Sequence, residues 1–263
     1  MRISIISFAG ANELTPKKDV LDFLRKNPMA EIGFGVSEQK SGTADSERFQ
    51  HIMGVQRIVG SHYEPGKIGT VGLHVNGIGT DGTKGWPHRV MNCDIPENLA
   101  KMIDFPRTSL QINFSNYDIS RKEAGKFATC RGCESFRHCR LRLPYNTKTA
   151  NVIEHAHLFN HARPCSFVKA DILFDASFGE GKLANKYEAP KFHGVRHIYA
   201  GGLGPENIYE ELGKIAEVQK DLGVVVGIDM EGKVRTDDGK TLDLNKADAV
   251  YKIVMDWLKD NGR

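Results

Sequence analysis

Eight short apolar segments, separated by segments of helical periodicity, restrict the fold of this 263-residue chain more than any other feature. Strands are expected at Ile3 to Ala9, Ala30 to Val36, Thr70 to Asn76, Ser109 to Phe114, Cys139 to Leu143, Ala170 to Phe174, His197 to Tyr199 and Val224 to Asp229. Helical spacing predicts helices at Pro16 to Lys26, Asp45 to Val59, Asn98 to Ile103, Lys122 to Ala128, Thr149 to His161, Pro205 to Leu222 and Lys246 to Lys259. Strand followed by helix, about eight times, is typical of βαβ units and a parallel sheet.

This alternation predicts an α/β fold, a (β/α)₈ TIM barrel formed by a single domain over residues 1–263. An open doubly wound sheet has the same local alternation, so the pattern alone leaves both folds open. Residues 77–97 and 176–196 are the longest irregular stretches. Loops of this length in a compact domain are usually lids or binding loops.

The composition excludes several classes of partner. The 36 basic and 33 acidic residues are mixed along the chain, so no block of charge indicates a nucleic-acid arm or a membrane-binding patch. The first apolar run is too short for a signal peptide, and no apolar window reaches the roughly 18 residues of a membrane span. We expect a cytoplasmic protein whose partner is a small molecule.

Two successive strand ends carry glycine turns that suit an anion. Residues 197–208 form a strand that runs into Gly201 and Gly202 and then into a proline-initiated helix, and Glu231, Gly232 and Lys233 follow the next strand. Glycines let an anion approach backbone amides, and phosphate sites of TIM barrels commonly lie after strands seven and eight. These residues therefore predict a phosphate site, with ordinary turns as the alternative.

Several motifs resemble those of the phosphoribosylanthranilate isomerase family, in the family's order across residues 70–235. They are Val71-Gly-Leu-His-Val-Asn76, Leu110-Gln-Ile-Asn113, Leu173-Phe-Asp-Ala-Ser177 with Gly179 and Gly181, Ala-Gly-Gly-Leu-Gly-Pro-Glu-Asn-Ile at 200–208, and Val226 to Val234. The first third of the chain matches poorly, and the segment 116–165 looks expanded. The resemblance implies a barrel that holds a phosphorylated, ribose-derived ligand at the carboxyl ends of its strands. Its phosphate contacts would be Gly201, Gly202 and the Glu231-Gly232 turn, with Asn113, Gly179, Gly181 and Lys182 as further ligand-binding candidates.

The same resemblance implies a catalytic acid but not a base. The family's reaction, an Amadori rearrangement, needs an acid and a base with separated pKa values. The acid matches Asp175, whereas the family's basic cysteine is replaced by Ser7, whose hydroxyl is a poor base. Asn113 stands where a histidine is expected, and the arginine expected after strand two is missing. We therefore expect an isomerase or lyase that uses proton transfer on a sugar phosphate, not an authentic family member. The alternatives are a non-catalytic phosphate-ligand-binding protein of the same fold and a metal- or cluster-dependent enzyme.

Other residues near predicted strand ends complete the candidate site. Glu38 and Asp229 are acidic candidates for catalysis, and Lys182 is a candidate to steer an anionic substrate. His74 alternates inward along its strand, where a hydrogen-bonded barrel histidine is a more common role than catalysis. Trp86 follows a glycine-rich stretch and is a candidate to close over a ligand ring.

Cysteines and histidines between residues 130 and 165 predict a metal site. The C-x₂-C-x₅-C spacing can place three thiolates around one zinc ion, and two histidines at i and i+4 share a helix face. The candidate ligands are Cys130, Cys133, Cys139, His157, His161 and Cys165. An iron–sulfur cluster on the four cysteines and a set of free thiols are the alternatives. The odd number of cysteines argues against a disulfide framework. The metal site is expected at the amino end of the barrel, and this place favours a structural metal over a catalytic one.

Overall fold

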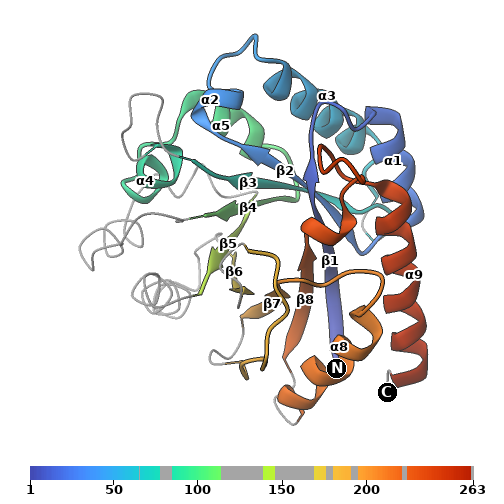
Figure 1. Ribbon diagram of the computed structural model, residues 1–263. Coiled ribbons are helices and arrows are strands. Elements are labelled where there is room, and N and C mark those ends of the chain that lie inside the picture. Colours follow the sequence, from blue (N-terminus) through green and yellow to red (C-terminus); the bar gives the residue numbers. More distant parts are fainter. Residues whose placement is uncertain are drawn as a thin grey trace.

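The structure is a computed structural model, and it describes residues 1–64, 66–77, 85–113, 139–145, 169–175, 180–190, 195–220 and 224–261. Eight parallel strands pair in sequence order and close into a barrel (Figure 1). They are β1 (Arg2–Ala11), β2 (Ala30–Val36), β3 (Thr70–Val75), β4 (Thr108–Ile112), β5 (Arg140–Pro144), β6 (Lys169–Asp175), β7 (Arg196–Ala200) and β8 (Val225–Met230). Because β8 pairs with β1, the open-sheet alternative is excluded and the (β/α)₈ barrel is confirmed.

Helices lie outside the strands in Figure 1. They are α1 (Lys17–Lys26), α2 (Glu38–Ser41), α3 (Glu47–Ser61), α4 (Gly85–Met91), α5 (Glu97–Ile103), α8 (Ile208–Val218) and α9 (Leu244–Asn261), with a 3₁₀ turn, η2 (Gly232–Val234), after β8. The helices expected at 122–128 and 149–161 lie outside the described residues. Within the described ranges, no helix is long and apolar enough to cross a membrane.

The helix after β7 begins at Ile208 and not at Pro205 as predicted. The amide side chain of Asn207 explains the difference, because it accepts a hydrogen bond from the Gly204 backbone at 2.9 Å and donates one to the Gly202 carbonyl, also at 2.9 Å. These two bonds hold residues 204–207 as a turn before the helix can start.

The outward faces of the strands form the apolar core. Side chains such as Phe8, Ile32 and Leu73 are fully buried there, in one continuous cluster with residues of the surrounding helices. Phe8 of β1 meets Phe23 of α1 edge to face, with ring centroids 5.7 Å apart. Burial of this layer between sheet and helices supplies the main hydrophobic stabilisation of the fold.

The inward faces of the strands are polar. The strand register places inward side chains in layers of four, contributed by alternate strands. Three successive layers, from the middle of the barrel toward the carboxyl ends, contain Ser7, Gly72, Arg142 and Ile198; then Gly33, Gln111, Leu173 and Asp229; then Ala9, His74, Pro144 and Ala200. TIM barrels usually fill these positions with Val, Ile and Leu. Here the interior instead contains charged and amide groups beside a small apolar cluster of Ile5, Leu173, Ile198 and Ala200.

An ion-pair cluster closes the amino end of the barrel. Asp171 of β6 is fully buried, and its carboxylate accepts hydrogen bonds from Arg140 of β5, at 2.7 Å, and from Arg196 of β7. The three strands are neighbours in the sheet, so these bonds tie them together at the end where residues usually serve stability.

Candidate active site at the carboxyl ends of the strands

Arg142 is the centre of a hydrogen-bond network inside the barrel. Its side chain is 0% exposed, and its Nη2 donates to Oε1 of Glu31 at 2.8 Å. Its Nη1 donates to Oγ of Ser7 at 3.2 Å and to Oε1 of Gln111 at 3.3 Å. Since Arg142 is on β5 whereas Ser7 and Glu31 are on β1 and β2, the guanidinium spans the barrel interior. The network therefore joins strands that are not neighbours in the sheet.

Glu31 remains ionised inside this network. Burial alone would raise its pKa, but the charge of Arg142 opposes burial and the pKa is lowered from 4.5 to about 2. Ser7 also donates to Oε1 of Glu31 at 3.1 Å. A buried carboxylate with a matched guanidinium and hydroxyl donors has the environment of a fixed charge, not of a group that exchanges protons.

Asp229 has a different environment although it lies in the same network. It sits on β8 one residue before the strand ends, and its Oδ1 is 3.6 Å from Nη1 of Arg142. That oxygen has no hydrogen-bond partner among the residues that the structure describes. Burial raises the pKa of Asp229, and the charges of Arg142 and His74 oppose this only in part. A buried carboxyl with a raised pKa at the carboxyl end of a barrel strand is suited to take up and release a proton.

His74 lies in the layer next to Asp229, on the side of the carboxyl ends. Its side chain is buried, as expected for a barrel histidine, but its Nε2 has no hydrogen-bond partner within the described part of the chain. A Cβ built on Gly33 would come within 2.7 Å of this nitrogen, so only glycine at position 33 leaves space for the ring. The sequence thus places a buried imidazole, with one ring nitrogen lacking a hydrogen-bond partner among the described residues, close to Asp229.

A chain of side-chain amides leads from Arg142 toward the mouth. Nε2 of Gln111 donates to Oδ1 of Asn113 at 3.0 Å, and Nδ2 of Asn113 donates to Oδ1 of Asn76 at 2.5 Å. Nδ2 of Asn76 donates in turn to the backbone carbonyl of His74 at 3.1 Å. Asn113, predicted to bind ligand, is half-buried between Gln111 and Asn76 in this chain, where amides suit recognition of hydroxyl and carbonyl groups.

Asp175 lies where the sequence predicted it. It is the last residue of β6, is half-buried, and pairs in register with Ala200 of β7. The layer just below it contains Ala9 and Ala200, which contribute short side chains from β1 and β7.

The glycine loops after β7 and β8 are adjacent, as the sequence predicted. A Cβ built on Gly204 would come within 2.5 Å of the Lys233 Cβ, and the ammonium group of Lys233 lies 2.9 Å from the Glu206 carboxylate. Gly201 and Gly202 have φ angles of +100° and +63°, which glycine adopts without strain. The backbone after β6 packs on the same loop, because a Cβ on Gly202 would lie 2.5 Å from the Leu183 amide nitrogen.

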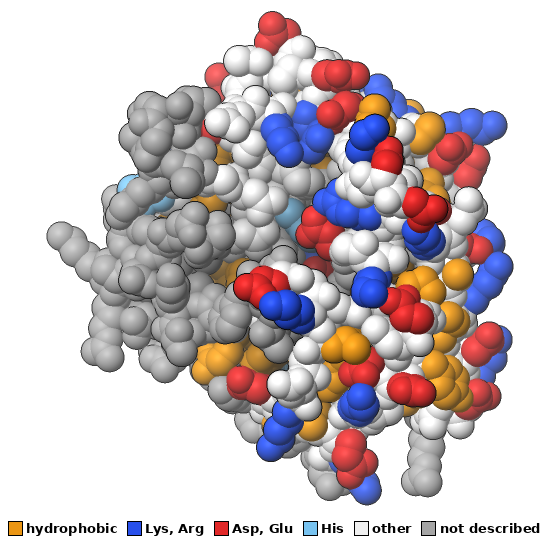
Figure 2. All heavy atoms as spheres, in the orientation of Figure 1, with side chains coloured by type: hydrophobic (Ala, Val, Ile, Leu, Met, Phe, Trp, Pro, Cys, Tyr) orange, Lys and Arg blue, Asp and Glu red, His pale blue; other side chains and the backbone are white. Residues whose placement is uncertain are grey.

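The charged residues predicted around these loops are paired with opposite charges. The Glu231 carboxylate accepts from Arg235 at 2.5 Å, and Lys182 donates to Glu180 at 2.5 Å on the surface. On the face shown in Figure 2, Lys and Arg alternate with Asp and Glu over the coloured surface. Attraction of an anion to this part of the barrel therefore depends on backbone amides more than on surplus positive charge.

Three predicted site residues lie away from the mouth. Ser7 is fully buried and two layers below His74, because β1 continues to Ala11 and not to Ala9 as predicted; it is a member of the Arg142 network. Glu38 is on α2 and lines a separate cavity outside the barrel. The Trp86 side chain is only 2% exposed, so it packs in the core and does not close over a ligand at the mouth.

The cysteines differ from the prediction in one respect. Cys93 is disulfide-bonded to a residue outside the described ranges, whereas Cys139 is a free, buried thiol directly before β5. Burial raises the pKa of Cys139. The remaining metal candidates, Cys130, Cys133, His157, His161 and Cys165, and the loop residue Gly179, lie outside the described residues; in the described part, no group of three or more potential ligands is placed to hold a metal ion.

Comparison with known proteins gives a fold and not a family. No protein family matches the chain, and no curated protein matches its sequence. Among solved structures, the chain is similar to a glycoside hydrolase family 30 subfamily 8 xylanase from Clostridium acetobutylicum, with a TM-score of 0.58 and 10% identity over 96% of this chain and 71% of the xylanase. A candidate fructose-1,6-biphosphate aldolase from Coccidioides immitis gives a TM-score of 0.48 and 11% identity, over 99% of this chain and 92% of the aldolase. The likeness to the xylanase supports the (β/α)₈ barrel.

Proposed function

We propose that the protein is an isomerase or lyase that transfers protons on a phosphorylated, sugar-derived small molecule bound at the carboxyl ends of the strands. The observation that carries the proposal is the environment of Asp229, a buried carboxyl with a raised pKa and one oxygen without a hydrogen-bond partner among the described residues. A structural carboxylate in the same barrel, Glu31, has a lowered pKa and accepts hydrogen bonds from Arg142 and Ser7. The two carboxyls lie in one network but their pKa values are shifted in opposite directions. Enzymes commonly use such a difference in environment to give neighbouring carboxyls different roles in proton transfer.

The chemistry assigned to the site is a proton shift next to a carbonyl group. The Asp229 carboxylate takes a proton from the carbon beside the carbonyl, which leaves an enediolate and a protonated Asp229. Asp229 then returns the proton to the former carbonyl carbon, while the hydroxyl group of the adjacent carbon loses its proton to become the new carbonyl and the former carbonyl oxygen gains a proton; the ligand is thereby isomerised and Asp229 is restored. His74 and Asp175 are the candidates to protonate the ligand oxygen, and the amides of Asn76 and Asn113 hold its hydroxyl groups.

The phosphate of the ligand is assigned to the glycine loops at Gly201, Gly202 and Gly232. Two observations support this assignment: the loops after β7 and β8 are adjacent, and their sequence resembles that of phosphoribosylanthranilate isomerases. That family remains a resemblance, because Ser7 replaces its catalytic cysteine and is buried in the Arg142 network. The proposed reaction therefore uses Asp229 in place of the family's base.

Solvent-exchange chemistry tests the proposal without knowledge of the natural substrate. The protein is incubated in D₂O with a panel of phosphorylated aldoses and ketoses, and deuterium incorporation at carbon is followed by NMR. We expect exchange on at least one compound, loss of exchange in Asp229→Asn, and retention in Glu180→Gln, an exposed carboxylate with the same change of charge. Binding of a panel member without exchange would instead identify a non-catalytic binding protein, and equal exchange by Asp229→Asn would reject the role of Asp229.

A further inference from the structure

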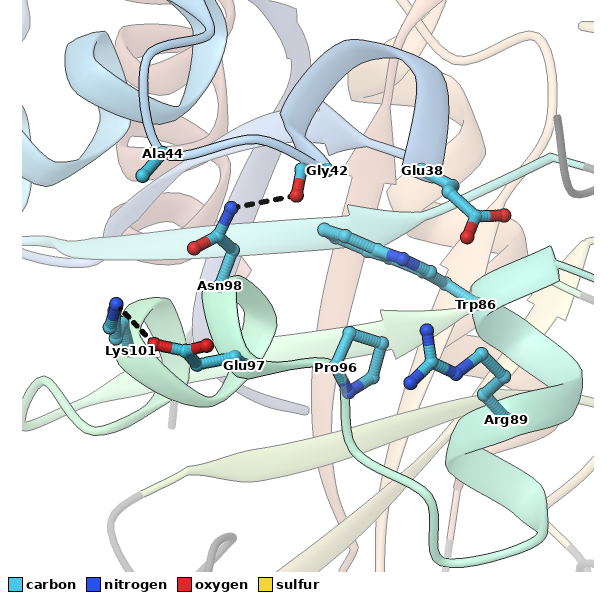
Figure 3. A pocket seen from close by; sticks show the side chains of 9 residues that line it. All are labelled: Glu38, Gly42, Ala44, Trp86, Arg89, Pro96, Glu97, Asn98 and Lys101. Atoms are coloured by element: carbon cyan, nitrogen blue, oxygen red, sulfur yellow. Dashed lines mark hydrogen bonds and ion pairs between the residues drawn. The ribbon is translucent and has the colours of Figure 1, made fainter.

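A second cavity lies outside the barrel, between α2, α4 and α5 (Figure 3). Its volume is about 290 Å³, which is close to the lower end of the range for small-molecule sites. Its lining includes Glu38, Trp86, Arg89, Pro96, Glu97 and Lys101, and none of its lining residues belongs to the candidate active site. Any ligand of this cavity is therefore separate from the ligand of the barrel mouth.

The charges around the cavity leave one carboxylate without a counter-ion. Arg89 is neutralised by Asp94, which accepts from its Nε at 2.7 Å and from its Nη2 at 3.1 Å. Lys101 is neutralised by Glu97 at 2.7 Å. Glu38 is half-buried and forms no ion pair or side-chain hydrogen bond with any residue that the structure describes, although Arg89 is near enough to feel its charge. Among the described residues around the cavity there is therefore one more carboxylate than there are cations.

The rest of the wall suits a short aliphatic group. In Figure 3 the Glu38 carboxylate points toward the cavity, and the Trp86 indole and the Pro96 ring lie beside it. Ala44 adds a further apolar contact on the opposite side. A positively charged head with a small apolar tail satisfies both the unmatched carboxylate and these surfaces.

We propose that this cavity binds the ammonium group of a small aliphatic amine, with Glu38 as its counter-ion. The ammonium group donates hydrogen bonds to the Glu38 carboxylate, and the carbon chain lies against Pro96 and the indole edge. Arg89 and Lys101 stay with their own partners, so the binding of a monocation brings the cavity to neutrality. The inference is independent of the proton-transfer reaction proposed above.

NMR titration of the ¹⁵N-labelled protein with n-butylammonium chloride tests the proposal. The chain has two tryptophans, so the spectrum contains two indole N–H signals; Trp86 lines the cavity, and Trp257 on α9 serves as the internal reference. We expect a saturable shift of the Trp86 signal alone. Loss of a charge-assisted hydrogen bond in Glu38→Gln should weaken binding by about tenfold.

Two controls make the result decisive. Glu64→Gln removes the same charge from an exposed residue that pairs with Lys67 and does not line the cavity, so it should bind n-butylammonium like the unaltered protein. n-Butanol has the same chain length without the charge and should not give a saturable shift. The proposal fails if Trp86 shows no saturable shift, if n-butanol binds as well as the amine, or if Glu38→Gln binds as well as Glu64→Gln.

Discussion

The guanidinium of Arg142 donates to the amide oxygen of Gln111 at 3.3 Å, and this contact sets the orientation of the connected side-chain amides of Gln111, Asn113 and Asn76. Arginine has only donors, so Gln111 must present its oxygen to Arg142 and its NH₂ group to Asn113. Asn113 then presents its own NH₂ to Asn76. The polar surface that a ligand meets is therefore set by a residue that it does not touch.

Removal of Arg142 should destabilise the protein strongly, because it leaves the Glu31 carboxylate buried without its counter-ion. We expect Arg142→Met to lower the free energy of unfolding by roughly 3–5 kcal/mol. The double variant Arg142→Met with Glu31→Gln should recover a substantial part of that loss, since no buried charge remains between the two positions. Urea denaturation of the single and double variants measures both effects, and strictly additive losses would contradict the pairing.

Acidification should destabilise the protein through Glu31. Its pKa is lowered to about 2 in the folded state against an ordinary value of 4.5, so its contribution to stability is complete above pH 4.5 and is lost as the pH falls toward 2. The free energy of unfolding, measured from pH 6 to pH 3, should therefore fall less steeply in Glu31→Gln than in the unaltered chain. Because Glu31→Gln also changes the stability at neutral pH, the slopes are compared and not the absolute values; parallel curves would refute the prediction.

The proposed reaction should lose rate on acidification through Asp229. Burial raises the pKa of this carboxyl, so the basic carboxylate is lost at a pH above the ordinary value of 3.8. The pH profile of deuterium exchange should show an acidic limb that begins above this value, and Asp229→Asn should reduce exchange by about 10²- to 10⁴-fold. Asp175→Asn shows whether the rim carboxyl also transfers a proton, since an unchanged exchange rate in this variant would remove Asp175 from the mechanism.

Gly202→Ala should disrupt the phosphate loop. The residue has a φ of +63°, and a Cβ would lie 2.5 Å from the backbone nitrogen of Leu183, so both strain and a backbone clash oppose alanine. Inorganic phosphate should raise the melting temperature of the unaltered protein but not that of Gly202→Ala. Gly213→Ala is the matched control, because a Cβ in this α8 residue meets nothing within 4 Å and the change should add up to about 1 kcal/mol of helix stability.

The disulfide of Cys93 limits the number of reactive thiols. Of the five cysteines in the sequence, two are used by this bond, so at most three should react with a thiol reagent in denaturant without reductant. Five reactive thiols would contradict the disulfide.

The sequence is sufficient to predict the order of the strands but not their ends. All eight predicted strands are present, because each apolar run is long enough to be buried between barrel and helices. The predicted end of β1 is wrong by two residues, since its pairing with β2 continues to Ala11 through a register irregularity that no local pattern indicates. The longer strand is the reason why Ser7 lies in the barrel interior and not at the mouth.

The candidate site is predictable only in part, and for a physical reason. Asp175, Asp229 and Asn113 can be found because strand ends are recognisable from apolar runs. Glu31 and Arg142 are absent from the predicted site, although Glu31 is the one charged residue of β2 and Arg142 lies between two leucines of β5, so each carries a usable signal. Their pairing cannot be predicted from local pattern, because it joins β2 to β5 across a closed barrel and depends on closure itself.

The space above Gly33 has a consequence for how this barrel can change over evolution. The imidazole of His74 occupies the volume that any side chain at position 33 would need. A homologous chain that gains even a methyl group at 33 must therefore replace the ring at 74 with something smaller, and a chain that keeps the ring must keep the glycine. Positions 33 and 74 should therefore covary among homologues. Chains with glycine at 33 should be those that retain the histidine beside the proposed catalytic carboxyl.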